Sequence, residues 1–153
     1  MTAKPMSLKA RAIAALARRE HSRTELALKL AVHAESEAAL AELLNELEAK
    51  NLLSSQRFVE SRVRQRENKY GAARILAELQ HHGVPAELLR QEAQRLKSSE
   101  FDRALHAWQR RFGQPPQTEK EKAQQLRFML ARGFTAETYF RIASQSFSAN
   151  HSQ

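Results

Sequence analysis

Two segments 50 residues apart in this chain of 153 residues have closely similar sequences. Gly83–Glu87 reads GVPAE, and Gly133–Glu137 reads GFTAE, each after a stretch with apolar residues at helical spacing. A weaker echo, at Leu30 and Ala34–Ser36, lies about 49 residues before Gly83. A period near 50 accommodates three helices but no large core, so the sequence predicts tandem three-helix modules rather than one globular unit.

Residue usage favours helices over a sheet. Alanine and leucine supply 44 residues, whereas the β-branched residues valine, isoleucine and threonine supply only 12. Alanine and straight-chain residues favour helix, and β-branched residues are typical of strands. The predicted fold is therefore all-α.

Serine and threonine before periodic apolar stretches mark the predicted helix starts. Ser22 with Glu25 and Thr118 with Glu121 have the spacing of capping boxes. The nine predicted helices are 8–19, 22–32, 36–50, 55–69, 72–82, 85–96, 98–112, 118–133 and 135–145. They group into modules at 1–52, 53–97 and 98–146, followed by a polar tail at 147–153. The apolar positions Phe101, Leu105, Trp108 and Phe112 fall on one helical stripe and predict a core face.

Several kinds of chemistry are excluded or disfavoured. The chain has no cysteine, and its four glycines are too scattered for a phosphate-binding loop. Adjacent His81 and His82 point about 100° apart on a helix and do not form a metal-binding pair. We therefore expect no metal, no cofactor and no enzymatic activity. No apolar run approaches 18 residues and no signal peptide is evident, which predicts a cytoplasmic protein without membrane contact.

Basic residues dominate the middle of the chain and give a net charge of +8. Arg62, Arg66 and Lys69 would share one face of a helix over 55–69, able to neutralise phosphates or to match an acidic protein groove. A solvated helix face is the alternative interpretation. A second, weaker basic patch lies within 110–132. The candidate contact residues are Arg57, Arg62, Arg64, Arg66, Lys69, Tyr70, Arg74, Arg127 and Arg132. Tyr70 has two interpretations, base stacking or packing against a neighbouring module.

The middle of the chain contains, in this order, Leu52-Leu53, Arg57-Phe58, Glu60, Arg62, Arg66, Gly71, Arg74-Ile75, Glu78-Leu79 and Gly83-Val84. This ordered set resembles the central motif of the bacterial RecX regulatory proteins. The flanks are also similar to that family, through Ser22, Glu25-Leu26, Lys29-Leu30, Trp108, Phe112, Arg127-Phe128, Leu130 and Arg132-Gly133-Phe134. One departure is Ala34-Glu35, where the family usually has glycine and an aromatic or large apolar residue. The resemblance therefore does not determine the geometry of the turn between the second and third helices of the first module.

The resemblance implies three tandem three-helix modules in an extended, curved arrangement. It also implies a partner, the RecA nucleoprotein filament: such proteins lie in the groove of the RecA–DNA filament and limit its growth. They thereby modulate ATP hydrolysis, strand exchange and the SOS response. This regulatory activity needs no catalytic residue, which agrees with the expectation that the protein is not an enzyme.

Two other functions stay open. One is direct, sequence-independent and salt-sensitive binding to single- or double-stranded DNA, because three-helix units resemble helix-turn-helix domains and the charge is positive. The other is a helical-repeat adaptor with an unrelated protein partner.

Overall fold

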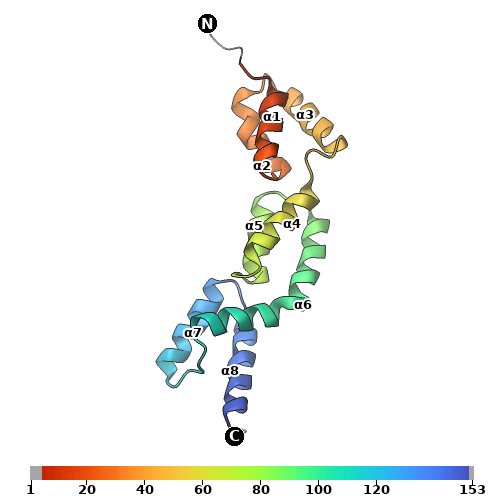
Figure 1. Ribbon diagram of the computed structural model, residues 1–153. Helices are drawn as coiled ribbons and strands as arrows, with labels where there is room; N and C mark the ends of the chain where they lie inside the picture. Colours follow the sequence, from red (N-terminus) through yellow and green to blue (C-terminus); the bar gives the residue numbers. More distant parts are fainter. Residues whose placement is uncertain (1–4, 152–153) are drawn as a thin grey trace. The chain divides into compact units, whose positions relative to one another are not determined.

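The computed structural model describes the backbone of residues 5–151 and the side chains of residues 5–145. Within this part the chain forms eight α-helices, one 3₁₀ helix and no strand (Figure 1). The predicted all-α fold is therefore confirmed. The helices are α1 (Leu8–Arg18), α2 (Arg23–Leu30), η1 (Ala31–His33), α3 (Glu37–Ala49), α4 (Ser55–Arg66), α5 (Ala72–His81), α6 (Ala86–Arg111), α7 (Glu119–Ala131) and α8 (Ala136–His151).

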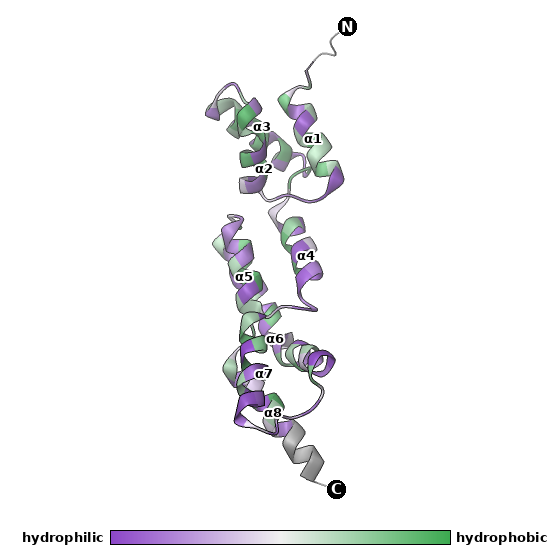
Figure 2. Cartoon of the chain, turned by 90° about the vertical axis from the view of Figure 1, so that its left-hand side faces the viewer, coloured by the Kyte–Doolittle hydropathy of each residue, from purple (hydrophilic) through white to green (hydrophobic). Residues whose placement is uncertain are grey.

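The chain divides into two compact units. The first contains residues up to Arg62 together with Leu79–Leu88, and the second contains Val63–Glu78 and the chain from Leu89 onward. The helices of both are amphipathic, with hydrophobic and hydrophilic residues on different sides of the ribbon (Figure 2). Each unit is described separately below.

The first unit begins with three helices around a leucine core. The hydroxyl oxygens of Ser7, Ser22 and Ser36 accept hydrogen bonds from backbone N–H groups in the first turns of α1, α2 and α3. These caps satisfy donors that have no partner inside a helix. The buried core of this region consists of Ala12, Leu26, Leu30, Leu43, Leu44, Leu47 and Leu53. Three of these residues, Leu43, Leu44 and Leu47, come from α3 and form the core face of that helix.

Polar contacts fix the junction between α1 and α2. Arg19 donates two hydrogen bonds, of 3.0 and 2.8 Å, to the carboxylate of Glu25. This pairing lowers the pKa of Glu25 to about 2. His21 is fully buried beside them and contacts the carbonyl of Arg19, and its desolvation lowers the pKa of the imidazole. The junction between α1 and α2 is therefore held by the Arg19–Glu25 ion pair and by the contact of His21 with the Arg19 carbonyl.

The turn that follows the second helix of each predicted module differs between the first module and the other two. Gly83 and Gly133 have φ of 72° and 92°, and the N–H groups of the next residues, Val84 and Phe134, donate to Leu79 and Met129. This is the glycine-dependent end of a helix, so the similarity of the two segments extends to their backbones. At the weaker echo there is no glycine. There the chain forms η1, and Ala34 is extended at φ −83° and ψ 141°.

The prediction of two helices over 85–96 and 98–112 is wrong, because α6 is continuous from Ala86 to Arg111. Serines at 98 and 99 suggested a helix start. Instead the hydroxyl of Ser98 donates to the carbonyl of Arg95, and that of Ser99 donates to the carbonyl of Leu96. Serine inside a helix bonds back to the preceding turn in this way and often bends the helix. Figure 1 shows α6 changing direction along its length. Eight α-helices, rather than nine, result in the described part of the chain.

The second unit has a core with a polar centre. Trp108 of α6, Met129 of α7 and Tyr139 of α8 are buried there. The other residues of the predicted stripe, Phe101, Leu105 and Phe112, are partly buried and pack against this core, so the predicted core face is confirmed. Gln125 is buried between them, and its Oε1 accepts from Trp108 Nε1 and from the Tyr139 hydroxyl, each at 2.9 Å. Burial raises the pKa of Tyr139, so its hydroxyl keeps the proton that it donates.

The last helix extends past its predicted end at residue 145. The backbone of α8 is helical to His151, so most of the segment predicted as a polar tail, 147–153, continues this helix. Residues 152–153 lie outside the described part of the chain. None of the described helices is both long and apolar enough to cross a membrane.

Candidate basic interface

Several arginines predicted as contacts are engaged inside the chain. Arg57 donates to the Glu20 carboxylate at 2.9 Å and, through its other nitrogens, to the side chain and carbonyl of Asn51. Arg66 forms two hydrogen bonds with Glu78, of 3.1 and 3.2 Å, and this pairing raises the pKa of Arg66. The guanidinium of Arg62 lies 5.2 Å from the ring centroid of Phe58. These three arginines therefore have structural roles within their units.

The prediction that Lys69 lies on the same helix face as Arg62 and Arg66 is wrong. The helix α4 ends at Arg66, and residues 67–70 form a turn in which the N–H groups of Lys69 and Tyr70 both donate to the carbonyl of Arg66. Arg64 stays on α4 and is exposed. The turn directs Lys69 and Tyr70 away from the helix and toward α6 and α7 of the second unit.

A close backbone contact between Gly71 and Gly133 brings this turn to the end of α7. The N–H of Gly71 donates to the carbonyl of Arg132 at 2.7 Å. A Cβ atom at Gly71 would lie 2.2 Å from the carbonyl oxygen of Gly133, so only glycine permits this approach. The contact places Tyr70 and Arg74 beside Arg132, about 60 positions away in the sequence.

Arginine and aromatic side chains alternate across this junction. The Arg74 guanidinium lies 4.1 Å from the ring centroid of Tyr70, and that of Arg132 lies 5.5 Å from Tyr70 and 5.0 Å from Phe128. The series continues with Arg111, 5.7 Å from Phe128 and 5.2 Å from Phe112. Each such contact contributes about 0.5–1 kcal/mol at an exposed site. We call these six residues, Tyr70, Arg74, Arg111, Phe112, Phe128 and Arg132, the aromatic–arginine cluster.

Arg103 also stabilises the turn at residues 67–70, and the sequence analysis did not identify it. Its guanidinium is largely buried in α6 and donates to the carbonyls of Glu67 and Tyr70 at 3.1 and 2.7 Å. It also pairs with Glu100, whose carboxylate accepts from the N–H of Ala72. Nothing in the sequence distinguishes this arginine from its exposed neighbours.

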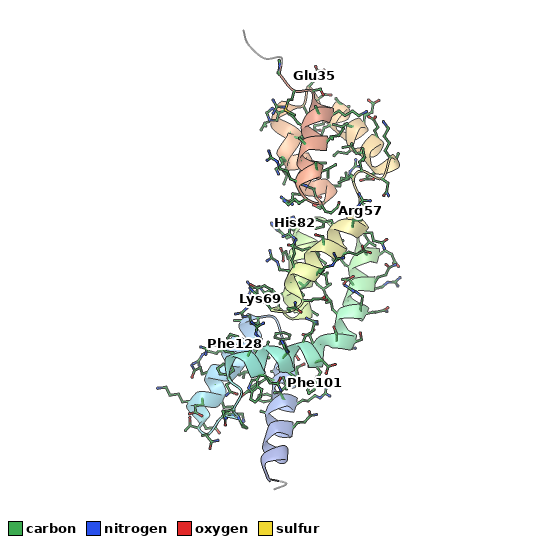
Figure 3. The ribbon with its side chains drawn as sticks, in the orientation of Figure 1. Glu35, Arg57, Lys69, His82, Phe101 and Phe128 are labelled. Carbon is green, nitrogen blue, oxygen red and sulfur yellow. The ribbon has the colours of Figure 1, made fainter. Side chains whose placement is uncertain are left out.

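A hollow of about 250 Å³ lies beside the aromatic–arginine cluster. Four basic side chains line it: Lys69 from the turn, Arg110 and Arg111 from the end of α6, and Arg132 from the end of α7. Phe128 and Ala107 supply its apolar lining, and Asn68 completes it. Two of the lining residues, Lys69 and Phe128, are labelled in Figure 3. Of the predicted candidates, Lys69, Tyr70, Arg74 and Arg132 are therefore brought together, whereas no contact joins the exposed Arg127 to them.

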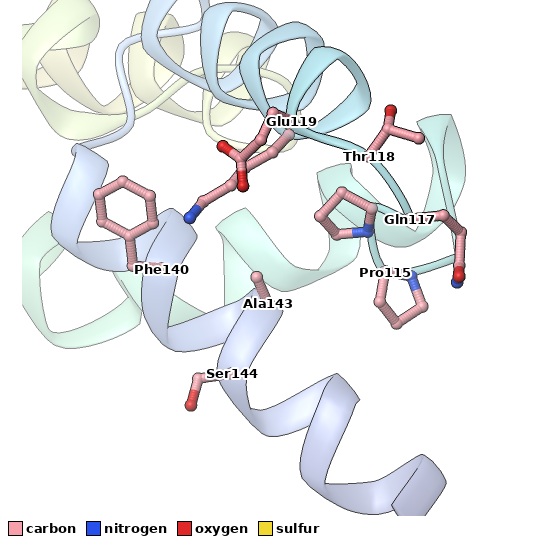
Figure 4. Close-up of a pocket in the computed structure, with 9 residues that line it drawn as sticks. Pro115, Gln117, Thr118, Glu119, Phe140, Ala143 and Ser144 are labelled. Atoms are coloured by element: carbon pink, nitrogen blue, oxygen red, sulfur yellow. The ribbon is translucent and has the colours of Figure 1, made fainter.

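A larger hollow, of about 610 Å³, lies between the loop before α7 and the middle of α8 (Figure 4). It is lined by both Lys122 and Glu119, so its charges offset each other, and the Lys122 ammonium lies 5.4 Å from the ring centroid of Phe140. Within residues 5–145, no group of three histidine, aspartate or glutamate side chains is placed to hold a metal ion. The hollow of Lys69 and Arg132 is the more strongly charged of the two.

The fold and the charge of this hollow define a class: an all-helical protein of tandem repeats that carries a positively charged surface. The sequence signature of the RecX second three-helix domain matches residues 56–91, and that of the RecX third three-helix domain matches residues 98–141. The chain belongs to the RecX family of regulatory proteins.

Similar proteins agree with this membership. The regulatory protein RecX of Ralstonia nicotianae is 49% identical over 90% of this chain and 87% of its own length. That of Neisseria meningitidis is 39% identical over 94% of both chains. The crystal structure of RecX from Lactobacillus salivarius superposes with a TM-score of 0.74 over 90% of this chain and 93% of its own, at 19% identity. That last likeness supports the fold alone.

Proposed function

We propose that this protein is a non-enzymatic regulator of RecA, which binds in the groove of the RecA–DNA filament and limits filament growth. ATP hydrolysis, strand exchange and the SOS response are then modulated through the amount of filament, in the cytoplasm. Membership of the RecX family supports the regulatory role. The proposal of a filament groove rests on the resemblance together with the positive charge of the chain.

The aromatic–arginine cluster and the hollow beside it supply the single observation that favours a charged partner. Four cations of the hollow, those of Lys69, Arg110, Arg111 and Arg132, have no acidic partner among residues 5–145. Because these cations line one hollow without acidic residues between them, they repel one another, and an anionic partner would reduce that repulsion. The residues of this surface come from two of the three predicted modules, 53–97 and 98–146, whereas the module at 1–52 contributes none.

RecA-catalysed, DNA-dependent ATP hydrolysis tests the proposal. Titration of this protein at amounts far too low to coat the DNA is expected to change the hydrolysis rate severalfold, because one bound regulator affects the growth of a whole filament. Binding to bare single-stranded DNA across a salt series serves as the control. An unchanged hydrolysis rate, alongside tight salt-dependent DNA binding, would favour the alternative of a direct DNA-binding protein.

A further inference from the structure

We propose that the hollow lined by Lys69, Arg110, Arg111 and Arg132 binds a phosphate group of a nucleic-acid backbone. This inference deepens the proposed function and rests on it for its setting, since it names DNA phosphate as the part of the filament that this surface contacts.

The charges of the hollow favour an anion. Its lining carries four cations and no acidic residue. Two helix ends oppose this charge, because Arg110 and Arg111 are in the last turn of α6 and Arg132 is the C-cap of α7. A helix C-terminus carries about half a negative charge, so the two ends offset about one of the four positive charges. The net charge of the hollow therefore remains strongly positive.

Two of the four cations, Arg111 and Arg132, are oriented before any ligand binds. The guanidinium groups of Arg111 and Arg132 lie 5.7 and 5.0 Å from the centroid of the same ring, that of Phe128. The backbone on either side of Lys69 is fixed by hydrogen bonds from Arg103 to the carbonyls of Glu67 and Tyr70. A planar guanidinium that is already oriented loses little entropy when it binds phosphate oxygens.

The size and lining of the hollow favour a nucleic-acid strand over an acidic side chain. A carboxylate supplies one charge and fills little of a space of about 250 Å³. A single strand supplies one phosphate per nucleotide, with an apolar sugar face between successive phosphates. Phe128 and Ala107 give that face an apolar surface to contact. Because contacts to phosphate oxygens carry no sequence information, the binding is expected to be independent of sequence.

Fluorescence anisotropy of a labelled oligothymidylate, measured without RecA, tests the hollow. The double variant Lys69→Gln/Arg110→Gln is expected to weaken binding about tenfold and to reduce the slope of log affinity against log salt by about 1. Neither side chain has a partner among residues 5–145, so the fold should persist, as checked by circular dichroism. Lys97→Gln, at an exposed position of α6 outside the hollow, is the matched control for Lys69→Gln and should change affinity less than twofold.

Two results would overturn the inference. One is that Lys69→Gln and Lys97→Gln weaken DNA binding equally, which leaves only a general effect of charge. The other is that the double variant loses affinity for a labelled polyglutamate peptide but keeps its affinity for DNA, which assigns the hollow to an acidic protein. In either case the wild-type effect on RecA-catalysed ATP hydrolysis is measured separately, so loss of the hollow and loss of the proposed function are told apart.

Discussion

Replacement of Gly71 by alanine is expected to lower the free energy of unfolding of the second unit by about 3 kcal/mol. The added Cβ would lie 2.2 Å from the carbonyl oxygen of Gly133, 2.4 Å from its carbonyl carbon and 2.6 Å from the nitrogen of Phe134. All three are backbone atoms, so the two segments must separate. The hydrogen bond from Gly71 to Arg132 is then lost, and Tyr70 moves away from the Arg132 guanidinium.

Urea unfolding followed by tryptophan fluorescence measures this effect, because Trp108 is the single tryptophan and lies in the core of the second unit. Gly113→Ala is the control. Gly113 has φ of +70°, but its nearest outside atom, the carbonyl oxygen of Gln109, would be 3.3 Å from the new Cβ. That variant should lose mainly the cost of a left-handed backbone, about 1–2 kcal/mol, because the Gln109 oxygen needs to shift by only a few tenths of an ångström. Equal losses in the two variants would argue against the close approach as the cause.

Replacement of Gln125 by leucine is expected to lower the free energy of unfolding by about 3 kcal/mol. The substitution leaves the Trp108 Nε1–H and the Tyr139 hydroxyl without their common acceptor. Each buried donor without a partner costs about 1–3 kcal/mol. In a chain of this size, such a loss lowers the melting temperature by about 10 °C, which a thermal scan by circular dichroism measures.

Two further variants test the cause. Gln124→Leu makes the same change one position earlier on α7, where the side chain is exposed, and should alter stability by no more than about 0.5 kcal/mol. Tyr139→Phe added to Gln125→Leu removes one of the two unsatisfied donors and should recover about 1 kcal/mol. A double variant no more stable than Gln125→Leu alone would mean that lost packing, rather than the unpaired hydroxyl, causes the destabilisation.

Local signals in the sequence predicted most of the helices. Capping at Ser22, Ser36 and Thr118, and the left-handed glycines at 83 and 133, act within a few residues, so the sequence contains all that determines them. The same local reasoning failed at Ser98 and Ser99. A serine hydroxyl caps the turn that follows or bonds to the turn before, and the absence of glycine or proline there lets the helix continue.

The candidate interface was predicted only in part, because long-range contacts assemble it. The charge pattern indicated Lys69, Tyr70, Arg74 and Arg132 as contact residues, but it indicated Arg57 and Arg66 equally. Their acidic partners, Glu20 and Glu78, are 37 and 12 residues away, and no pattern in the sequence pairs them. The contact between Gly71 and Gly133 is a feature of the tertiary structure alone.

The length of RecA filaments on single-stranded DNA, measured by electron microscopy at a low ratio of this protein to RecA, tests the proposed function most directly. We predict that the wild-type protein shortens the filaments severalfold. The variant Lys69→Gln/Arg110→Gln should shorten them less, and Lys97→Gln should act as the wild type does. Filaments of unchanged length in the presence of the wild-type protein would contradict the proposal that it limits filament growth.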